Sequence, residues 1–245
     1  MAMDLNVIGS SSSGNCYVIG NSTEALILEA GVAFREVKKV LGYNLRKVVG
    51  CLITHRHNDH AKYIDKMVEC GIRTLALPDV WTAKGLNPGR YGVAIEAYKG
   101  YKLGNFKIVP FNALHDVACV GYHIEHPEIG RLLFLTDSAD CPHIFPGLNH
   151  VMIECNYSMP RLIEAINEGV TRKAQLERLP NSHMELGTCK SVLGEHDLSG
   201  VQDIILLHLS EHNSVAPQFE EEIERLTGKM VYVARPGLTL DITKI

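Results

Sequence analysis

The sequence lacks the features that mark a protein for export or for a membrane. No apolar run is long enough to cross a bilayer, and the first 20 residues are rich in serine and glycine without a basic start. The seven cysteines include no Cys-x-x-Cys pair, and their odd number is unlike a disulfide framework. We therefore expect a reduced, cytoplasmic protein that makes no contact with a membrane.

The sequence also lacks an excess of positive charge. It has 24 Lys and Arg against 28 Asp and Glu, a net charge of −4, which gives no general attraction to nucleic acid. The acids gather partly in a predicted helix over residues 218–226, so nucleic acid is not excluded as a partner. Residues 160–179 are locally basic, with Arg161, Arg172, Lys173 and Arg178. They form either an ordinary solvated helix face or a cap that contacts phosphates.

Linkers, low-complexity tracts and blocks of like charge are absent as well. A chain of 245 residues that is 46% hydrophobic can bury a full core. The candidate metal ligands described below run from residue 55 to residue 208, so a boundary between them would divide the site. We therefore expect a single domain over residues 1–245.

What the sequence does contain is a dense cluster of metal-binding side chains, the segment Thr-His-Arg-His-Asn-Asp-His over residues 54–60. It follows an apolar, partly β-branched run at residues 48–54, which predicts a buried strand. His55 and His57 are two residues apart, so in an extended segment they face the same side. Asp59 and His60 follow after the chain turns. One short segment thus offers two ligand pairs, as a two-metal site requires.

This motif resembles that of the metallo-β-lactamase superfamily, and later segments resemble its remaining motifs in order. They are Ala-Leu-His-Asp ending at Asp116, Leu-Leu-Phe-Leu-Thr-Asp ending at Asp137, and Leu-Leu-His-Leu-Ser ending at Ser210. The resemblance implies one metal held by His55, His57 and His115, and a second held by Asp59, His60 and His208. Asp137 would bridge the two ions, and a hydroxide between them would be the nucleophile. The ions would be zinc or manganese, with iron also compatible.

Further segments resemble the YycJ/WalJ-type exonuclease group of this superfamily. They are the Ser-Gly-Asn-Cys loop that contains Asn15, the Glu-x-Asn segment that ends at Asn156, and the His-Leu-Ser-x-x-Asn segment that contains Ser210 and Asn213. The resemblance implies that these four residues contact substrate. It also implies that His183 acts as a catalytic acid beside the leaving group, together with Asp59 as a catalytic residue. An unconnected surface position is the alternative for His183.

One residue departs from the pattern of this group in its early strand. The sequence Leu-Ile-Leu-Glu-Ala-Gly places Glu29 where the group has Asp. That position braces the ligand loop from behind the metal, so we expect a shifted brace and an intact metal site. The segment around His183 departs more widely from the group, since it reads Asn-Ser-His-Met-Glu.

The resemblance implies an α/β fold, the αβ/βα four-layer sandwich in which two mixed β-sheets are flanked by helices. It implies a dinuclear metal-dependent phosphodiesterase acting on nucleic acid, a 5′→3′ DNA exonuclease. The same ligands also serve hydrolases of small phosphodiester or thioester metabolites, which remain an alternative. A catalytically weak nucleic-acid-binding or regulatory protein is an alternative of another class.

Overall fold

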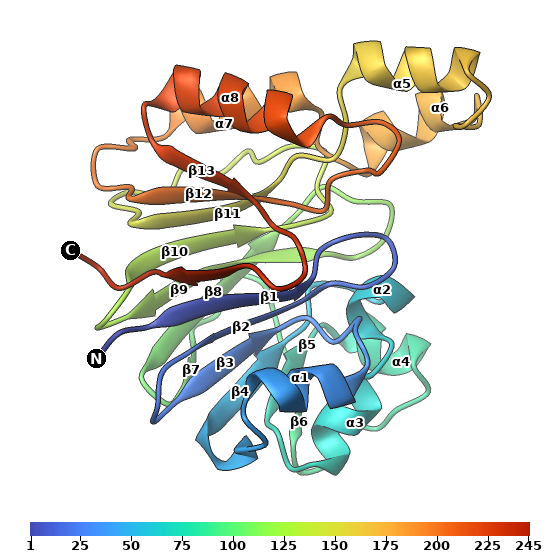
Figure 1. Ribbon diagram of the computed structural model, residues 1–245. Helices are drawn as coiled ribbons and strands as arrows, with labels where there is room; N and C mark the ends of the chain where they lie inside the picture. Colours follow the sequence, from blue (N-terminus) through green and yellow to red (C-terminus); the bar gives the residue numbers. More distant parts are fainter.

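Two seven-stranded sheets stack face to face in the computed structural model, which describes residues 1–245 (Figure 1). The first sheet has the order β14-β1-β2-β3-β4-β5-β6. Its strands are β1 (Asp4–Gly9), β2 (Cys16–Gly20), β3 (Ala25–Leu28), β4 (Val48–Leu52), β5 (Thr74–Ala76), β6 (Gly92–Ala94) and β14 (Thr239–Asp241). Strands β14 to β3 pair antiparallel, whereas β3 to β6 pair parallel, so the sheet is mixed.

The second sheet has the order β13-β12-β11-β10-β9-β8-β7 and is also mixed. Its strands are β7 (Tyr101–Leu103), β8 (Phe106–Asn112), β9 (Val120–His126), β10 (Gly130–Leu135), β11 (His150–Glu154), β12 (Asp203–Leu207) and β13 (Met230–Val233). Strands β10 to β13 are parallel. All residues of β11 and β12 are buried, as is usual for strands covered on both faces.

Helices cover the outer face of each sheet, which makes four layers (Figure 1). Below the first sheet lie α1 (Phe34–Val40), α2 (Asn58–Ala61), α3 (Ile64–Glu69) and α4 (Pro78–Ala83). Above the second lie α7 (Leu186–Glu195) and α8 (Ala216–Thr227), with α5 (Met159–Asn167) and α6 (Gln175–Arg178) at one end. Two short 3₁₀ helices span Leu45–Lys47 and Leu179–Asn181. The expected four-layer sandwich of two mixed sheets is confirmed.

The apolar core has three large parts that follow these layers, and a small fourth cluster contains Tyr157, Leu162 and Leu179. The largest cluster, 24 buried residues from Met3 to Ile242, fills the space between the sheets. A cluster of 19 lies between the second sheet and α7 and α8, and one of 17 lies between the first sheet and its helices.

No helix is both long enough and apolar enough to cross a membrane.

The helical segment that follows β4 is interrupted. It is divided into α2, which ends at Ala61, and α3, which begins at Ile64. In a continuous helix the Tyr63 amide would donate to the Asp59 carbonyl. That carbonyl instead accepts from the Asn15 amide at 2.7 Å, and Tyr63 donates to Ala30 at 2.9 Å. The break fixes the Asp59 segment to the loops that follow β1 and β3.

Candidate metal centre and active site

The candidate ligands lie where strands of both sheets end at a single edge, on the right of Figure 1. His55 follows β4, Asp137 follows β10 and His208 follows β12. Asp137 and His208 have positive φ values of 49° and 54°. Such a backbone is unfavourable by about 1–3 kcal/mol for residues other than glycine, and it persists where the surroundings fix it. Both of these strained residues direct their side chains into the site.

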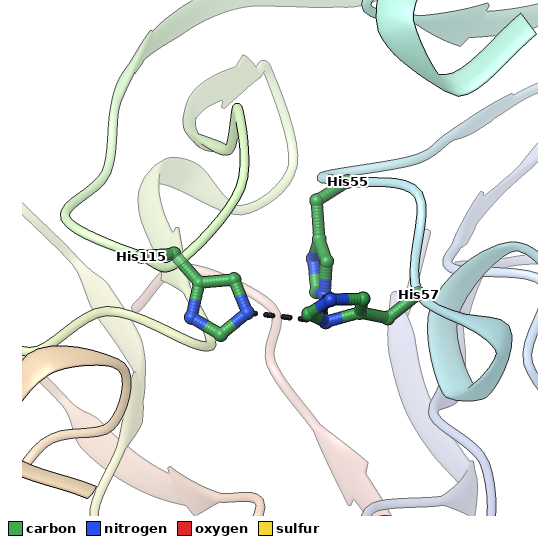
Figure 2. Close-up of side chains that lie close together, drawn as sticks. All are labelled: His55, His57 and His115. Atoms are coloured by element: carbon green, nitrogen blue, oxygen red, sulfur yellow. Dashed lines mark hydrogen bonds between the residues drawn. The ribbon is translucent and has the colours of Figure 1, made fainter. Parts of the chain in front are cut away.

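Three imidazoles form the first ligand group. His55 Nε2 lies 3.0 Å from His57 Nδ1, and His115 Nε2 lies 3.2 Å from the same atom. Figure 2 shows the three rings converging, with His55 and His57 from one loop and His115 from another. Their ligand atoms lie within 4.8 Å of one another. The three residues expected to share one ion are thus brought together.

The chemistry of this group fits a cation. His115 Nδ1 lies 2.7 Å from the carbonyl oxygen of Ser182, which can only accept, so Nδ1 carries the proton. In the neutral ring, Nε2 then directs its lone pair toward the other two histidines. Burial lowers the pKa of His55 well below its ordinary value and also lowers that of His57. Imidazole nitrogens that converge in this way can hold a divalent metal.

The second ligand group combines carboxylates and imidazoles. His60 Nε2 lies 3.4 Å from Asp59 Oδ2, and His208 Nε2 lies 3.4 Å from the same oxygen. Asp137 completes the group, whose ligand atoms again lie within 4.8 Å of one another. Burial lowers the pKa of His60, but Asp137 and Glu29 outweigh this and raise it well above its ordinary value. The cluster of acids therefore requires positive charge, from a proton or from a cation.

Asp137 lies between the two groups. Its Oδ1 is 3.3 Å from His60 Nε2, and its Oδ2 is 3.8 Å from His55 Nε2 and 3.9 Å from His115 Nε2. The two oxygens of one carboxylate therefore face different ligand groups. Burial raises the pKa of Asp137, but His208 and His60 more than offset this and lower it well below its ordinary value. The side chain is thus an ionised acceptor placed between two candidate metal positions.

Glu29 braces both groups from behind. Its Oε1 accepts from Thr54 Oγ1 at 2.5 Å, and Thr54 Oγ1 lies 2.9 Å from His55 Nδ1. The same carboxylate oxygen lies 3.3 Å from His60 Nδ1. Glu29 is fully buried and has a φ of 66°. The longer acid therefore reaches one histidine directly and the other through a hydroxyl, which agrees with the expected shifted brace.

His183 lies beside the second group. The ligand atoms of His183, Glu154, Asp137 and His208 lie within 4.8 Å of one another. The His183 ring stacks on His208 with centroids 5.4 Å apart and planes 7° apart. Its Nδ1 is 2.6 Å from Glu154 Oε1. Burial lowers the pKa of His183, but the Glu154 carboxylate outweighs this and raises it to about 9. Glu154 therefore holds His183 beside the second ligand group.

An open cleft of about 550 Å³ leads to the second group. His183, Ser210, Asn213 and Asn156 line it. Asn156 is nearly buried and its amide donates to the His208 carbonyl at 2.7 Å. Asn15 is fully buried outside this lining, with Nδ2 3.0 Å from His60 Nε2. These two geometries favour positioning of the ligands, and contact of any of the four residues with substrate stays a prediction.

Sequence reasoning did not assign three residues of this site. Glu154 is an acid that ends an apolar strand at residues 150–154, and this position is a usable signal. Asp116 Oδ1 lies 3.1 Å from His115 Nε2, and its position directly after that histidine is the corresponding signal. The Ser182 carbonyl, which orients His115, left no signal because any residue type offers a carbonyl.

Comparisons with known proteins agree with this geometry. The sequence model of the Metallo-beta-lactamase superfamily matches residues 11–126. Exodeoxyribonuclease YycJ of Bacillus anthracis is 24% identical over 174 residues, 66% of each chain. Exodeoxyribonuclease WalJ of Streptococcus pneumoniae serotype 2 is 23% identical over 226 residues, covering 86% of this chain and 82% of that one. The metallo-beta-lactamase fold protein YhfI of Bacillus subtilis superposes with a TM-score of 0.73 at 17% identity, over 98% and 99% of the chains.

The fold and the ligand groups define a metal-dependent hydrolase. Residues 11–126 match the metallo-β-lactamase superfamily, and the two exonuclease relatives support the resemblance of the chain to the YycJ/WalJ-type group.

Proposed function

We propose that this chain is a dinuclear phosphodiesterase that cleaves nucleic acid, as a 5′→3′ DNA exonuclease. The observation that carries the proposal is the position of His183, which lies beside the second ligand group and is held by Glu154 at 2.6 Å. Cleavage of a phosphodiester releases an alkoxide as the leaving group, and a nearby proton donor assists its departure. Cleavage of a thioester releases a stable thiolate, which has less need of such a donor. The two relatives are named exodeoxyribonucleases, which supports the same substrate class.

Each residue has a proposed role that follows from its position in the site. His55, His57 and His115 would hold one ion, Asp59, His60 and His208 the other, and Asp137 would contact both. Bound zinc, manganese or iron would polarise the phosphoryl group and make a nucleophile available at neutral pH. His183 would give its Nε2 proton to the leaving oxygen, while Glu154 stabilises the charged ring through Nδ1. Asp59 serves the reaction through its ligand position, and Ser210 and Asn213 would contact the substrate strand.

The proposal includes the setting of the protein. All seven cysteines are free and six of them are buried, which supports a reducing compartment such as the cytoplasm. Because the core between the sheets takes residues from Met3 to Ile242, we also propose that residues 1–245 form one domain.

The decisive experiment is a cleavage assay with the full chain loaded with Mn²⁺ or Zn²⁺. Single- and double-stranded DNA and RNA, labelled at the 5′ or 3′ end, should show loss of nucleotides from one end of DNA. Label released first from the 5′ end would support the proposed polarity. Rapid hydrolysis of a glutathione thioester with no cleavage of nucleic acid would instead favour a metabolite hydrolase. Binding of DNA with no turnover of any substrate would favour a binding protein.

A further inference from the structure

Arg178 is the only arginine or lysine that lines the cleft beside the metal centre. The other charged side chains of the lining, histidines aside, are the acids Asp59, Asp137 and Glu211. Arg178 is the last residue of α6, and its side chain is 60% exposed. Its Nη2 atom lies 3.9 Å from Asp116 Oδ2, the only acid within ion-pair distance. The cleft therefore has a single permanent cation, and that cation is weakly engaged.

The backbone of Arg178 is tied to the first ligand group. Ser182 Oγ donates to the Arg178 carbonyl at 2.9 Å, and the Ser182 carbonyl accepts from His115 Nδ1 at 2.7 Å. Two hydrogen bonds thus connect the end of α6 to a candidate metal ligand. This connection fixes the backbone of Arg178 relative to the first ligand group, whereas its guanidinium remains exposed.

Asp116 lies between the guanidinium and the first ligand group. Its Oδ2 faces Arg178, while its Oδ1 lies 3.1 Å from His115 Nε2. An exposed pair at this separation contributes little free energy, so another anion can replace the carboxylate easily. A phosphate oxygen is a suitable replacement, because the planar guanidinium binds phosphates through paired N–H groups.

We propose that Arg178 binds a phosphoryl oxygen of the substrate, leaving Asp116 as it does so. The inference rests on the proposed function and names the residue that recognises the anionic backbone. It also separates Arg178 from the other cations of the basic segment. Arg161 pairs with Glu164 at 2.7 Å and Glu168 at 3.0 Å, away from the cleft. Arg172 and Lys173 are exposed and do not line the cleft.

Arg178→Gln tests this, with Arg172→Gln as the matched control from the same segment. Both variants should keep the wild-type melting temperature, because both side chains are exposed. The KM for end-labelled single-stranded DNA should rise about 10- to 100-fold in Arg178→Gln, the range for losing a hydrogen bond to a charged group. Arg172→Gln should stay within about twofold. EDTA removes the metal ions. In its presence, fluorescence anisotropy with labelled DNA should again show weaker binding by Arg178→Gln than by Arg172→Gln. Arg178→Lys should restore part of the binding.

A nitrophenyl phosphodiester distinguishes which phosphate is bound, because it carries only the one that is cleaved. A KM raised for both substrates would assign Arg178 to that phosphate, and a KM raised for DNA alone would assign it to a flanking one. Equal effects of the two glutamine variants on every substrate would overturn the inference. If wild-type protein ignores DNA, the proposed function fails. Arg178 is then judged on the nitrophenyl substrate alone, where an unchanged KM overturns the inference and a raised KM supports it.

Discussion

The side chains of Glu154 and His183 form a closely held pair, with Glu154 Oε1 2.6 Å from His183 Nδ1. The same carboxylate accepts from the amides of Ser138 at 2.8 Å and Met184 at 3.2 Å through Oε2. Glu154 ends β11, and His183 precedes α7. One buried acid thus connects the turn after Asp137, the segment before α7 and the candidate proton donor.

Glu154→Gln tests this connection. The glutamine oxygen can still accept from the two amides, but its NH₂ group would face His183 Nδ1 and reverse that hydrogen bond. The ring would then lose its stabilising negative charge. We expect kcat on DNA to fall about 10- to 100-fold, the range for a residue that supports a functional histidine. His183→Ala should lower kcat about 10²- to 10⁴-fold.

Two measurements separate this role from a structural one. A nitrophenyl phosphodiester has a good leaving group, so both variants should lose much less rate on it than on DNA. Metal content measured by elemental analysis should stay near wild type. Equal losses on both substrates would argue against proton donation, and a lost ion in His183→Ala would identify His183 as a ligand.

Asp137→Ala should abolish activity and remove at least one bound ion, because the two oxygens of this carboxylate face different ligand groups. The measurement is metal stoichiometry after loading with excess metal and gel filtration. Asp140→Ala is the control, since Asp140 is exposed and only three residues away. An unchanged stoichiometry in Asp137→Ala, or one ion per wild-type chain, would contradict a bridging role.

Gly31→Ala should damage the site without changing any ligand. A Cβ atom at Gly31 would lie 1.7 Å from the Asp59 carbonyl oxygen and 2.8 Å from the Asn15 amide. Backbone must move to relieve this overlap, and we expect a loss of about 3 kcal/mol or more in unfolding free energy, with weaker metal binding. Gly194→Ala in α7 meets nothing within 4 Å and should stabilise by about 0.5–1 kcal/mol. Urea unfolding of both variants measures the difference, and similar stabilities would refute the predicted overlap.

Glu24 should give a pH-dependent contribution to stability far from the metal centre. Burial raises the pKa of Glu24, but hydrogen bonds from His126 at 3.0 Å and Asn105 at 2.6 Å outweigh it and lower the pKa. Because the pKa of Glu24 is lowered by folding, its stabilisation is complete above its pKa in the unfolded chain, about 4.3. The stabilisation is lost as the pH falls through the pKa of Glu24 in the folded protein.

Glu24→Gln should therefore lower the unfolding free energy at pH 7 by about 1–3 kcal/mol. Urea unfolding between pH 7 and pH 3 should show this difference from wild type shrinking below about pH 4.3. Glu96→Gln, at a largely exposed ion pair, should have little effect at any pH. A difference that stays constant with pH would contradict the assignment.

The sequence predicts the ligands better than it predicts their surroundings. His55, Asp137 and His208 each follow an apolar strand, and parallel strands bring their carboxyl ends to one edge, so their meeting can be expected. The contact between Glu154 and His183 joins positions 29 residues apart, with α5, α6 and a 3₁₀ helix between them, and no local pattern encodes it. The interrupted helix at Tyr63 likewise depends on Asn15, which is distant in sequence.

The pairing of β1 with β14 has a consequence for synthesis of the protein. Asp4 pairs with Asp241, and Met3 and Ile242 belong to the same core. While the ribosome is still adding residues, β1 keeps an open edge that can pair with other chains. The first sheet is therefore completed only after nearly the whole chain has emerged. Chains that stop before residue 239 would carry every ligand from His55 to His208 and yet remain prone to aggregation.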